Sequence, residues 1–275
     1  MNTDREKELK HQEAMLARNM AGILAKVLVL SNKGGVGKSF AAVNIAAGLS
    51  GLGAKTGLLD ADIHGPSVAK MLGFEGKEPP MVMEGIIPFR INPNLLAFSM
   101  ASLLEHADTP VIWRGPRKTG VLRQFLAEVL WGKLDYLIID SPPGTGDEPL
   151  SICQMIHNLT GAIIVTTPQD IALLDSRKCV RFLQQLSVPI LGILENMSGL
   201  TCPKCGVNID LFKSGGGEKA AREMGVPFLG RIPLDPRIVE TTDNGKPFIE
   251  MHPDSEAAKI LGNICRLIDE RIRVE

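Results

Sequence analysis

The chain has 275 residues, of which 44% are hydrophobic, and its 30 basic and 31 acidic side chains give a formal net charge of −1. This length suits one large or two small domains with a substantial core, and the near-zero charge provides no overall attraction to nucleic acid or an anionic membrane. No apolar stretch approaches the roughly 20 residues that a membrane-spanning helix needs, and residues 1–30 lack the order of a signal peptide. We therefore expect a cytoplasmic protein that binds neither nucleic acid nor membranes.

Apolar runs with the character of buried strands alternate with longer segments of helical spacing. These runs are residues 26–30, 55–60, 136–140, 162–167, 190–196 and 227–233. Continuous apolar strands that alternate with helices indicate an α/β fold in which a mostly parallel, doubly wound sheet has helices on both faces. We expect a single domain over residues 22–275, preceded by a charged extension, residues 1–21, that forms a solvated helix or a frayed tail.

Two further segments have a distinct composition. Residues 73–94 are rich in glycine and proline and predict a small β-hairpin excursion. Residues 255–272 place apolar side chains at helical spacing, and Arg266, Arg271 and Arg273 could bind acidic lipids. Asp269, Glu270 and Glu275 oppose a membrane anchor, so we expect this helix to pack on the edge of the domain.

A glycine-rich loop, SNKGGVGKSF (residues 31–40), joins the first expected strand to a helix expected over residues 37–50. In such a loop the backbone N–H groups and the positive end of the helix converge on phosphate. We expect Lys38 to reach the β- and γ-phosphates and Ser39 to hold Mg²⁺. The general pattern G-x-x-x-x-G-K-[ST] fails because Asn32 stands at its first position, and a purely structural turn is the alternative.

The loop resembles the deviant Walker A motif of the dimerising ATPases, the class that includes the nitrogenase iron protein and the septum-site and partition ATPases. The resemblance implies that Lys33 reaches across a two-fold interface to the partner's nucleotide, where a further cation stabilises the charge of phosphoryl transfer. A solvated loop lysine is the alternative. The residues assigned to nucleotide binding in this loop are Asn32, Lys33, Gly34, Gly35, Val36, Gly37, Lys38, Ser39 and Phe40.

Two of the expected strands end in carboxylates, at the edge of the sheet where open α/β folds bind ligands. By the resemblance, Asp62 orients the attacking water and Asp60 supports the Mg²⁺ shell. Asp140 is expected to bind the ion through water, and the N–H of Gly144 to sense the γ-phosphate. The carboxylates could instead cap the turns that follow them. The expected catalytic residues are Lys33, Lys38 and Asp62.

The expected base is adenine. No guanine-reading N-K-x-D motif follows the later strands, so ATP is favoured over GTP. Asn196 matches the position that recognises adenine in the class, because an amide can donate to and accept from the base edge. The loop of residues 232–236, with Pro233 and Asp235, is expected to close over the same base. An asparagine at a strand end could also be a simple turn residue.

The sequence contains five cysteines, of which only Cys202 and Cys205 are closely spaced. Two thiols three positions apart in a glycine-ended turn can bind one metal, but they make only half of a tetrahedral site. A two-fold dimer would supply four thiolates to one metal or cluster. A zinc ion shared across the dimer and a redox pair are the alternatives. The remaining cysteines fall in expected helices and are expected to be buried thiols: Cys153, Cys179 and Cys265.

Further stretches narrow the resemblance. They are WRGP (113–116), QFLAEVLWGKLDYLIIDSPPGTGDEPLS (124–151), ENMSGLTCPKCG (195–206) and GRIPLDPRIVETTDNGKPF (230–248). Together they resemble the Mrp family of iron–sulfur cluster carrier ATPases, also described as the ApbC or Nbp type, over roughly residues 22–265.

This resemblance implies a homodimer that binds ATP, hydrolyses it slowly, and passes a [4Fe–4S] cluster to apo-proteins. It also implies that Cys202 and Cys205 bridge the cluster between subunits. Phe40 departs from the family, which usually has Ser or Thr there, so nucleotide affinity is expected to be weaker. A partition-type dimerising ATPase and an NTPase with a dimer-bridging structural zinc are the alternative functions.

Overall fold

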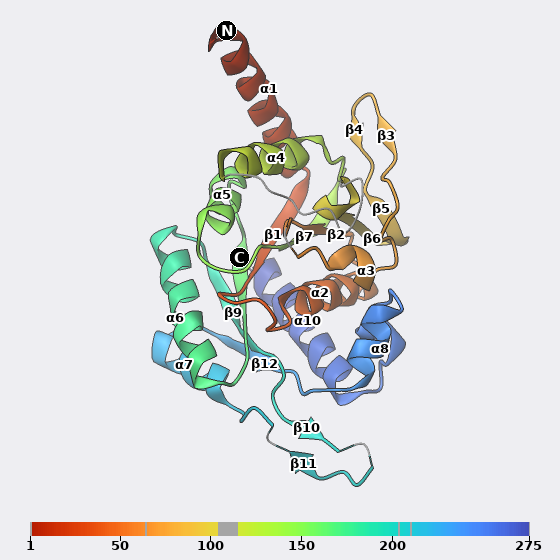
Figure 1. Ribbon diagram of the computed structural model, residues 1–275, viewed down its shortest axis with the longest axis vertical. Coiled ribbons are helices and arrows are strands. Elements are labelled where there is room, and N and C mark those ends of the chain that lie inside the picture. The colour runs from red at the N-terminus through yellow and green to blue at the C-terminus, as the bar shows by residue number, and fades with distance from the viewer. Residues whose placement is uncertain (1, 64, 104–114, 203, 210, 275) are drawn as a thin grey trace.

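A computed structural model of the chain describes residues 2–63, 65–103, 115–202, 204–209 and 211–274. Its centre is a sheet of eight strands, in which every neighbouring pair is parallel except the last (Figure 1). From one edge to the other the strands are β12 (Phe228–Arg231), β9 (Ile190–Glu195), β8 (Gly161–Thr166), β1 (Ile23–Leu30), β7 (Leu134–Asp140), β2 (Thr56–Asp60), β6 (Leu95–Ser99) and β5 (Phe89–Asn92). The chain order reverses around β1, which places the loop after β1 where such sheets bind ligands.

All six expected strands are present, but the sheet has two more, β5 and β6, that the sequence analysis did not predict. Residues 73–94 were expected to form only a hairpin excursion. Within them β3 (Met81–Val82) and β4 (Gly85–Ile86) do pair as a separate hairpin, whereas β5 joins the main sheet. A tight turn, in which the Asn94 N–H donates to Asn92 Oδ1 at 2.9 Å, returns the chain from β5 into β6.

Helices cover both faces of the sheet, each over its own apolar cluster. One face is covered by α2 (Lys38–Gly51), α3 (Val68–Met71), α8 (Arg237–Asp243), α9 (Phe248–Met251) and α10 (Glu256–Val274). The other is covered by α1 (Asn2–Ala21), α4 (Gly115–Glu128), α5 (Asp147–Met155), α6 (Asp170–Gln185) and α7 (Gly216–Met224). A short 3₁₀ helix, η1 (Met100–Leu103), follows β6. Two cores on opposite faces confirm the doubly wound α/β fold class.

The charged N-terminal segment is a helix, and its second half is packed rather than solvated. Leu16 and Met20 of α1 are buried in the cluster that also contains residues of α4. The Asn19 side chain donates to the Val129 carbonyl at 3.1 Å, which ties α1 to the end of α4. The charge of this segment concealed the apolar positions on one side of the helix.

The C-terminal helix α10 packs on the domain, as expected. Its inward side is fully or nearly fully buried against α2 and the sheet, through Ala257, Ala258, Leu261, Ile264, Cys265 and Ile268. Within the described residues, no helix combines the length and the apolar character that crossing a bilayer requires. The apolar side chains of α10 therefore serve the core.

A second small hairpin, β10 (Leu200–Thr201) with β11 (Asn208–Ile209), projects from the body at the end opposite α1 (Figure 1). It lies between β9 and α7 in the chain. The hairpin encloses the closely spaced cysteine pair, which therefore extends away from the sheet.

Replacing Leu261 by Ala tests whether α10 belongs to the core. Leu261 is fully buried, so its truncation should lower the free energy of unfolding by about 2–5 kcal/mol, measured by urea denaturation. The control Lys259→Ala removes an exposed side chain of the same helix and should stay within about 0.5 kcal/mol of the wild type. Equal stability of both variants would show that the fold does not depend on α10.

Candidate functional site

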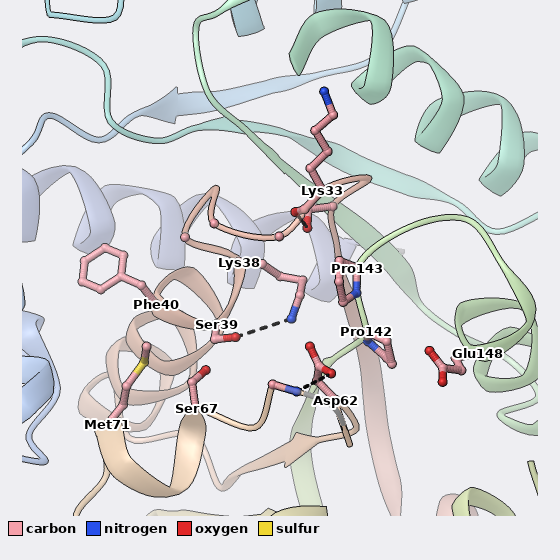
Figure 2. Close-up of a pocket in the computed structure, with 15 residues that line it drawn as sticks. Lys33, Lys38, Ser39, Phe40, Asp62, Ser67, Met71, Pro142, Pro143 and Glu148 are labelled. Atoms are coloured by element: carbon pink, nitrogen blue, oxygen red, sulfur yellow. Dashed lines mark hydrogen bonds between the residues drawn. The ribbon is translucent and has the colours of Figure 1, made fainter. Parts of the chain in front are cut away.

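The glycine-rich loop between β1 and α2 borders a cavity of about 630 Å³ (Figure 2). Gly35 and Gly37 adopt positive φ angles of +79° and +86°, a left-handed conformation that other residues rarely adopt. A cavity of this size is within the range of small-ligand sites. Its lining residues are Ser31, Lys33, Gly34, Gly35, Gly37, Lys38, Ser39, Phe40, Asp62, Gly65, Ser67, Met71, Pro142, Pro143 and Glu148.

Lys38 points into this cavity, and its ammonium group is buried against a carboxylate. Lys38 Nζ lies 2.5 Å from Asp140 Oδ1, where the lysine is 7% exposed and the aspartate fully buried. The ammonium also lies 3.4 Å from the hydroxyl of Ser39, so the three predicted side chains are together. Asp140 Oδ2 is buried and has no hydrogen-bond partner among the described residues.

The parallel register of β2 and β7 brings the predicted carboxylates together. Asp60 and Asp140 are direct partners across these strands, and Asp62 follows two residues later. Asp60 Oδ1 accepts from the Asp62 N–H at 3.1 Å, while Oδ2 accepts from the Ser99 hydroxyl at 2.9 Å. Both oxygens of Asp60 therefore bond within the protein, which favours a role in holding the Asp62 turn over direct contact with a metal.

Burial of these carboxylates changes their ionisation. Desolvation, and then the charge of Asp140, raise the pKa of Asp60 to about 7 although Lys38 opposes the shift. Desolvation also raises the pKa of Asp140, against the attraction of Lys38. One ammonium group does not balance the negative charge buried here. A divalent cation would, and the Ser39 hydroxyl and the unpartnered Asp140 oxygen are ligands of the type that Mg²⁺ prefers.

The second lysine of the loop, Lys33, also borders the cavity, but its side chain points away from that of Lys38 (Figure 2). Its ammonium lies 2.7 Å from Asp175 Oδ2 on α6, with the Lys33 side chain 48% exposed. Lys33, followed by Lys178, lowers the pKa of Asp175. The two lysines of the loop thus have opposite orientations.

The residues predicted to bind the base lie outside the phosphate cavity. Asn196 follows β9, is 5% exposed, and donates from Nδ2 to the Val36 carbonyl at 2.9 Å. A Cβ atom on Gly37 would come within 2.0 Å of the same Nδ2, so this approach requires glycine. Pro233 and Asp235 line a different cavity, of about 480 Å³, together with Cys202.

Three more of the predicted residues lie in the glycine-rich loop or bond to it. The Gly144 N–H, predicted to sense the γ-phosphate, donates to the Ser31 carbonyl at 2.7 Å. Phe40, where the resemblance implies a hydroxyl residue, is buried, and its ring centroid lies 6.2 Å from that of Phe248, so it also packs α2 against α9. Asn32 lies in the loop between Ser31 and Lys33 and is half-buried.

Sequence reasoning missed several residues of the site. Ser67, Met71, Pro142, Pro143 and Glu148 line the cavity without having been assigned to it, although all lie within or just after the predicted acidic motifs. No signal marked Asp175, because the α6 segment contains no motif and its approach to Lys33 depends on the fold. The WRGP stretch begins outside the described residues, at positions 113 and 114.

The two predicted metal-binding cysteines lie on the projecting hairpin. Cys202 is half-buried and Cys205 exposed, and both thiols are free. Hydrogen bonds from the backbone of Cys205, and then of Lys204, lower the pKa of Cys202. Among the described residues, no group of three or more His, Cys, Asp or Glu side chains could hold a metal within one chain.

The other three thiols have raised rather than lowered pKa values. Desolvation raises the pKa of Cys153 to about 11 and those of Cys179 and Cys265 to about 12. Cys179 and Cys265 are buried in helices as expected, whereas Cys153 lies in a helix but is only half-buried.

Known proteins resemble the chain over nearly its whole length. The family model described as ParA, NUBPL iron-transfer P-loop NTPase, matches residues 22–269. The iron-sulfur cluster carrier protein of Methanocaldococcus jannaschii is 49% identical over 269 residues, which cover 98% of this chain and 92% of that protein. The cytosolic Fe-S cluster assembly factor NUBP2 homolog of Trichoplax adhaerens is 46% identical over 248 residues, covering 89% and 94%.

A solved structure supports the same relationship. The nucleotide-binding protein of Archaeoglobus fulgidus in complex with ADP is 34% identical, with a TM-score of 0.75, and the match covers 85% of this chain and 91% of that chain. Together with the family model, this likeness confirms the expected P-loop NTPase fold.

Replacing Asp60 by Asn tests the burial of charge at the strand ends. Between the usual value of 3.8 and the raised pKa of about 7, the folded nucleotide-free protein keeps a proton that the unfolded chain has lost. Through this group, the free energy of unfolding falls as pH rises across that range, and Asp60→Asn should lack this part of the slope. Urea denaturation across the range measures it, with the exposed Asp254→Asn as control. Parallel curves for wild type and Asp60→Asn would contradict the shift.

Proposed function

Because the chain belongs to the family of NUBPL iron-transfer P-loop NTPases, we propose that it binds and hydrolyses ATP as a homodimer and carries an iron–sulfur cluster. The cluster is a [4Fe–4S] cargo, held between subunits and transferred to apo-proteins. One observation supports this most strongly: the paired thiols Cys202 and Cys205 lie on a hairpin that leaves the sheet directly after Asn196, which bonds to the phosphate loop. The relatives described as cluster carriers and assembly factors support the choice of cargo.

In this proposal a water molecule in the phosphate cavity attacks the γ-phosphate in line with the leaving group. Lys38 leaves Asp140 to neutralise the β- and γ-phosphates, and Asp62 orients the water. Ser39 and, through water, Asp140 would hold Mg²⁺, which would neutralise part of the phosphate charge. Asn196, Pro233 and Asp235 enclose the adenine, while Gly144 exchanges its bond to Ser31 for the γ-phosphate.

Lys33 acts in trans. Lys33 borders its own cavity, but its side chain points away from that of Lys38, and its ammonium becomes available to a partner once the ion pair with Asp175 opens. A partner's nucleotide is a stronger site for it than the single carboxylate of Asp175, because a triphosphate concentrates more charge. Dimer closure then depends on ATP.

The cargo site is completed by symmetry. Each chain offers two thiols, and a two-fold axis between the hairpins supplies four thiolates to one cluster. The lowered pKa of Cys202 favours the thiolate that ligates metal. Four thiolates also suit zinc, so metal analysis decides between a cluster carrier and a zinc-stabilised NTPase.

The remaining features follow from the same proposal. Residues 22–275 work as one nucleotide-driven unit, with residues 1–21 as an extension, and hydrolysis is slow because it times cargo exchange. The protein works in the cytoplasm on acceptor apo-proteins and binds neither nucleic acid nor membranes. A partition-type ATPase would leave Cys202 and Cys205 without a role.

Mixed dimers test the trans role of Lys33. Lys33→Ala and Asp62→Asn chains should each lose ATP hydrolysis by about a hundredfold or more, while Lys33→Ala retains near-normal nucleotide affinity. Mixing them in equal amounts should restore about a quarter of wild-type activity, because half of the dimers are mixed and each has one complete site. If Lys33 acts on its own nucleotide, mixing restores nothing.

Removing the paired thiols tests the cargo. After anaerobic reconstitution with iron and sulfide, the wild type should hold about four iron atoms per dimer and absorb visible light. The Cys202→Ser, Cys205→Ser variant should lose both signals and keep ATP binding, and the control Cys153→Ser should keep both. Zinc in place of iron in the native protein, or a cluster in the double variant, would contradict the proposal.

A further inference from the structure

The cysteine arm, residues 197–214, starts directly after Asn196 and returns to the body just before α7. Both of its ends meet the side chain of Glu195, the last residue of β9, which is fully buried. The Ser198 hydroxyl donates to Glu195 Oε1 at the start of the arm. The Gly215 N–H donates to the same oxygen at 2.9 Å just beyond its end, and the Gly217 N–H donates to Oε2.

The segment KSGGGEK (213–219) has the composition of an anion-binding turn at the start of a helix. In this protein the carboxylate of Glu195 occupies that turn. Gly215 has a φ of +84°, and a Cβ on Gly217 would lie 3.0 Å from both the Cβ and Oε2 of Glu195, so the glycines make room for this side chain. Arg231 Nε lies 3.8 Å from Oε1 and adds a positive charge.

The backbone at the same point joins the arm to the loop after β12. The Ile232 N–H donates to the Glu195 carbonyl at 2.8 Å, and the Ser198 N–H donates to the Ile232 carbonyl at 3.0 Å. The Leu234 N–H then donates to the Gly199 carbonyl at 2.8 Å. The next residue after Glu195 is Asn196, whose amide bonds to Val36 of the phosphate loop.

We propose that Glu195 is the positioning residue of the cysteine arm. Its carboxylate fixes both ends of the arm on the end of β9, so that Cys202 and Cys205 are presented at one place relative to the phosphate loop. This inference rests on the proposed function, in which two arms must meet. Thiolates from two chains can share a cluster only if the supporting structure holds them close to their bonding geometry. If the two ends of the arm were not fixed, one arm could leave the shared site.

Glu195→Gln tests this directly, because the amide NH₂ replaces one acceptor oxygen against N–H donors and removes the charge. In the apo protein, hydrogen exchange of the amides in segment 213–217 should become about tenfold faster or more. After reconstitution, cluster loss to an iron chelator should become about tenfold faster, while ATP affinity changes less than twofold. The matched control is Glu218→Gln, which removes an exposed partner of the same Arg231 and should leave all three readouts unchanged.

The outcomes separate this inference from the proposed function. Unchanged exchange in Glu195→Gln, or faster exchange with unchanged cluster loss, overturns the positioning role. A wild type that binds no cluster overturns the proposed function, whereas hydrogen exchange in the apo protein still reports whether Glu195 holds the arm. If Glu195→Gln fails to fold, Ser198→Ala removes only the hydroxyl bond at the start of the arm. It should speed cluster loss by about threefold, and a wild-type rate would overturn the inference.

Discussion

Buried negative charge at the carboxyl ends of β2 and β7 is the constraint on which the rest of the structure depends. Asp60 and Asp140 are partners in a parallel register, both fully buried, and Lys38 supplies one ammonium, which pairs with Asp140. Burying carboxylates without full compensation is costly, as the raised pKa of Asp60 reflects. The phosphate loop, the left-handed glycines and the Asp62 turn are arranged around this charge, which a cation bound with nucleotide would balance.

The two lysines of the loop after β1 lie in different environments. Lys38 is buried and directed inward, whereas Lys33 is half-exposed and paired with Asp175 on α6. The end of β9 makes a similar division between consecutive residues. Glu195 bonds to the two ends of the cysteine arm, and Asn196 bonds to the phosphate loop. Successive side chains of a strand point in opposite directions, so one strand end can serve both.

The sequence patterns predicted those elements that depend on neighbouring residues in the chain. The apolar run before Ser31, the glycines after it and the apolar spacing of α2 were sufficient for the strand, loop and helix, and the family resemblance is confirmed. The strands β5 and β6 were missed because a tight turn joins them and β5 lies within the glycine- and proline-rich residues 73–94. Asp175 and Glu195 were missed for another reason: their partners are distant in sequence, and a single acidic residue in a helix or at a strand end gives no periodic signal.

The thiols differ in acidity, and this difference decides which of them oxidants attack first. Three thiols with a pKa of about 11 to 12 stay almost wholly protonated at neutral pH, and a protonated sulfur reacts slowly with peroxides and alkylating agents. The exposed arm, with its more acidic Cys202, is then where such damage concentrates. Chemical injury would modify the thiols of the arm while sparing the interior of the fold.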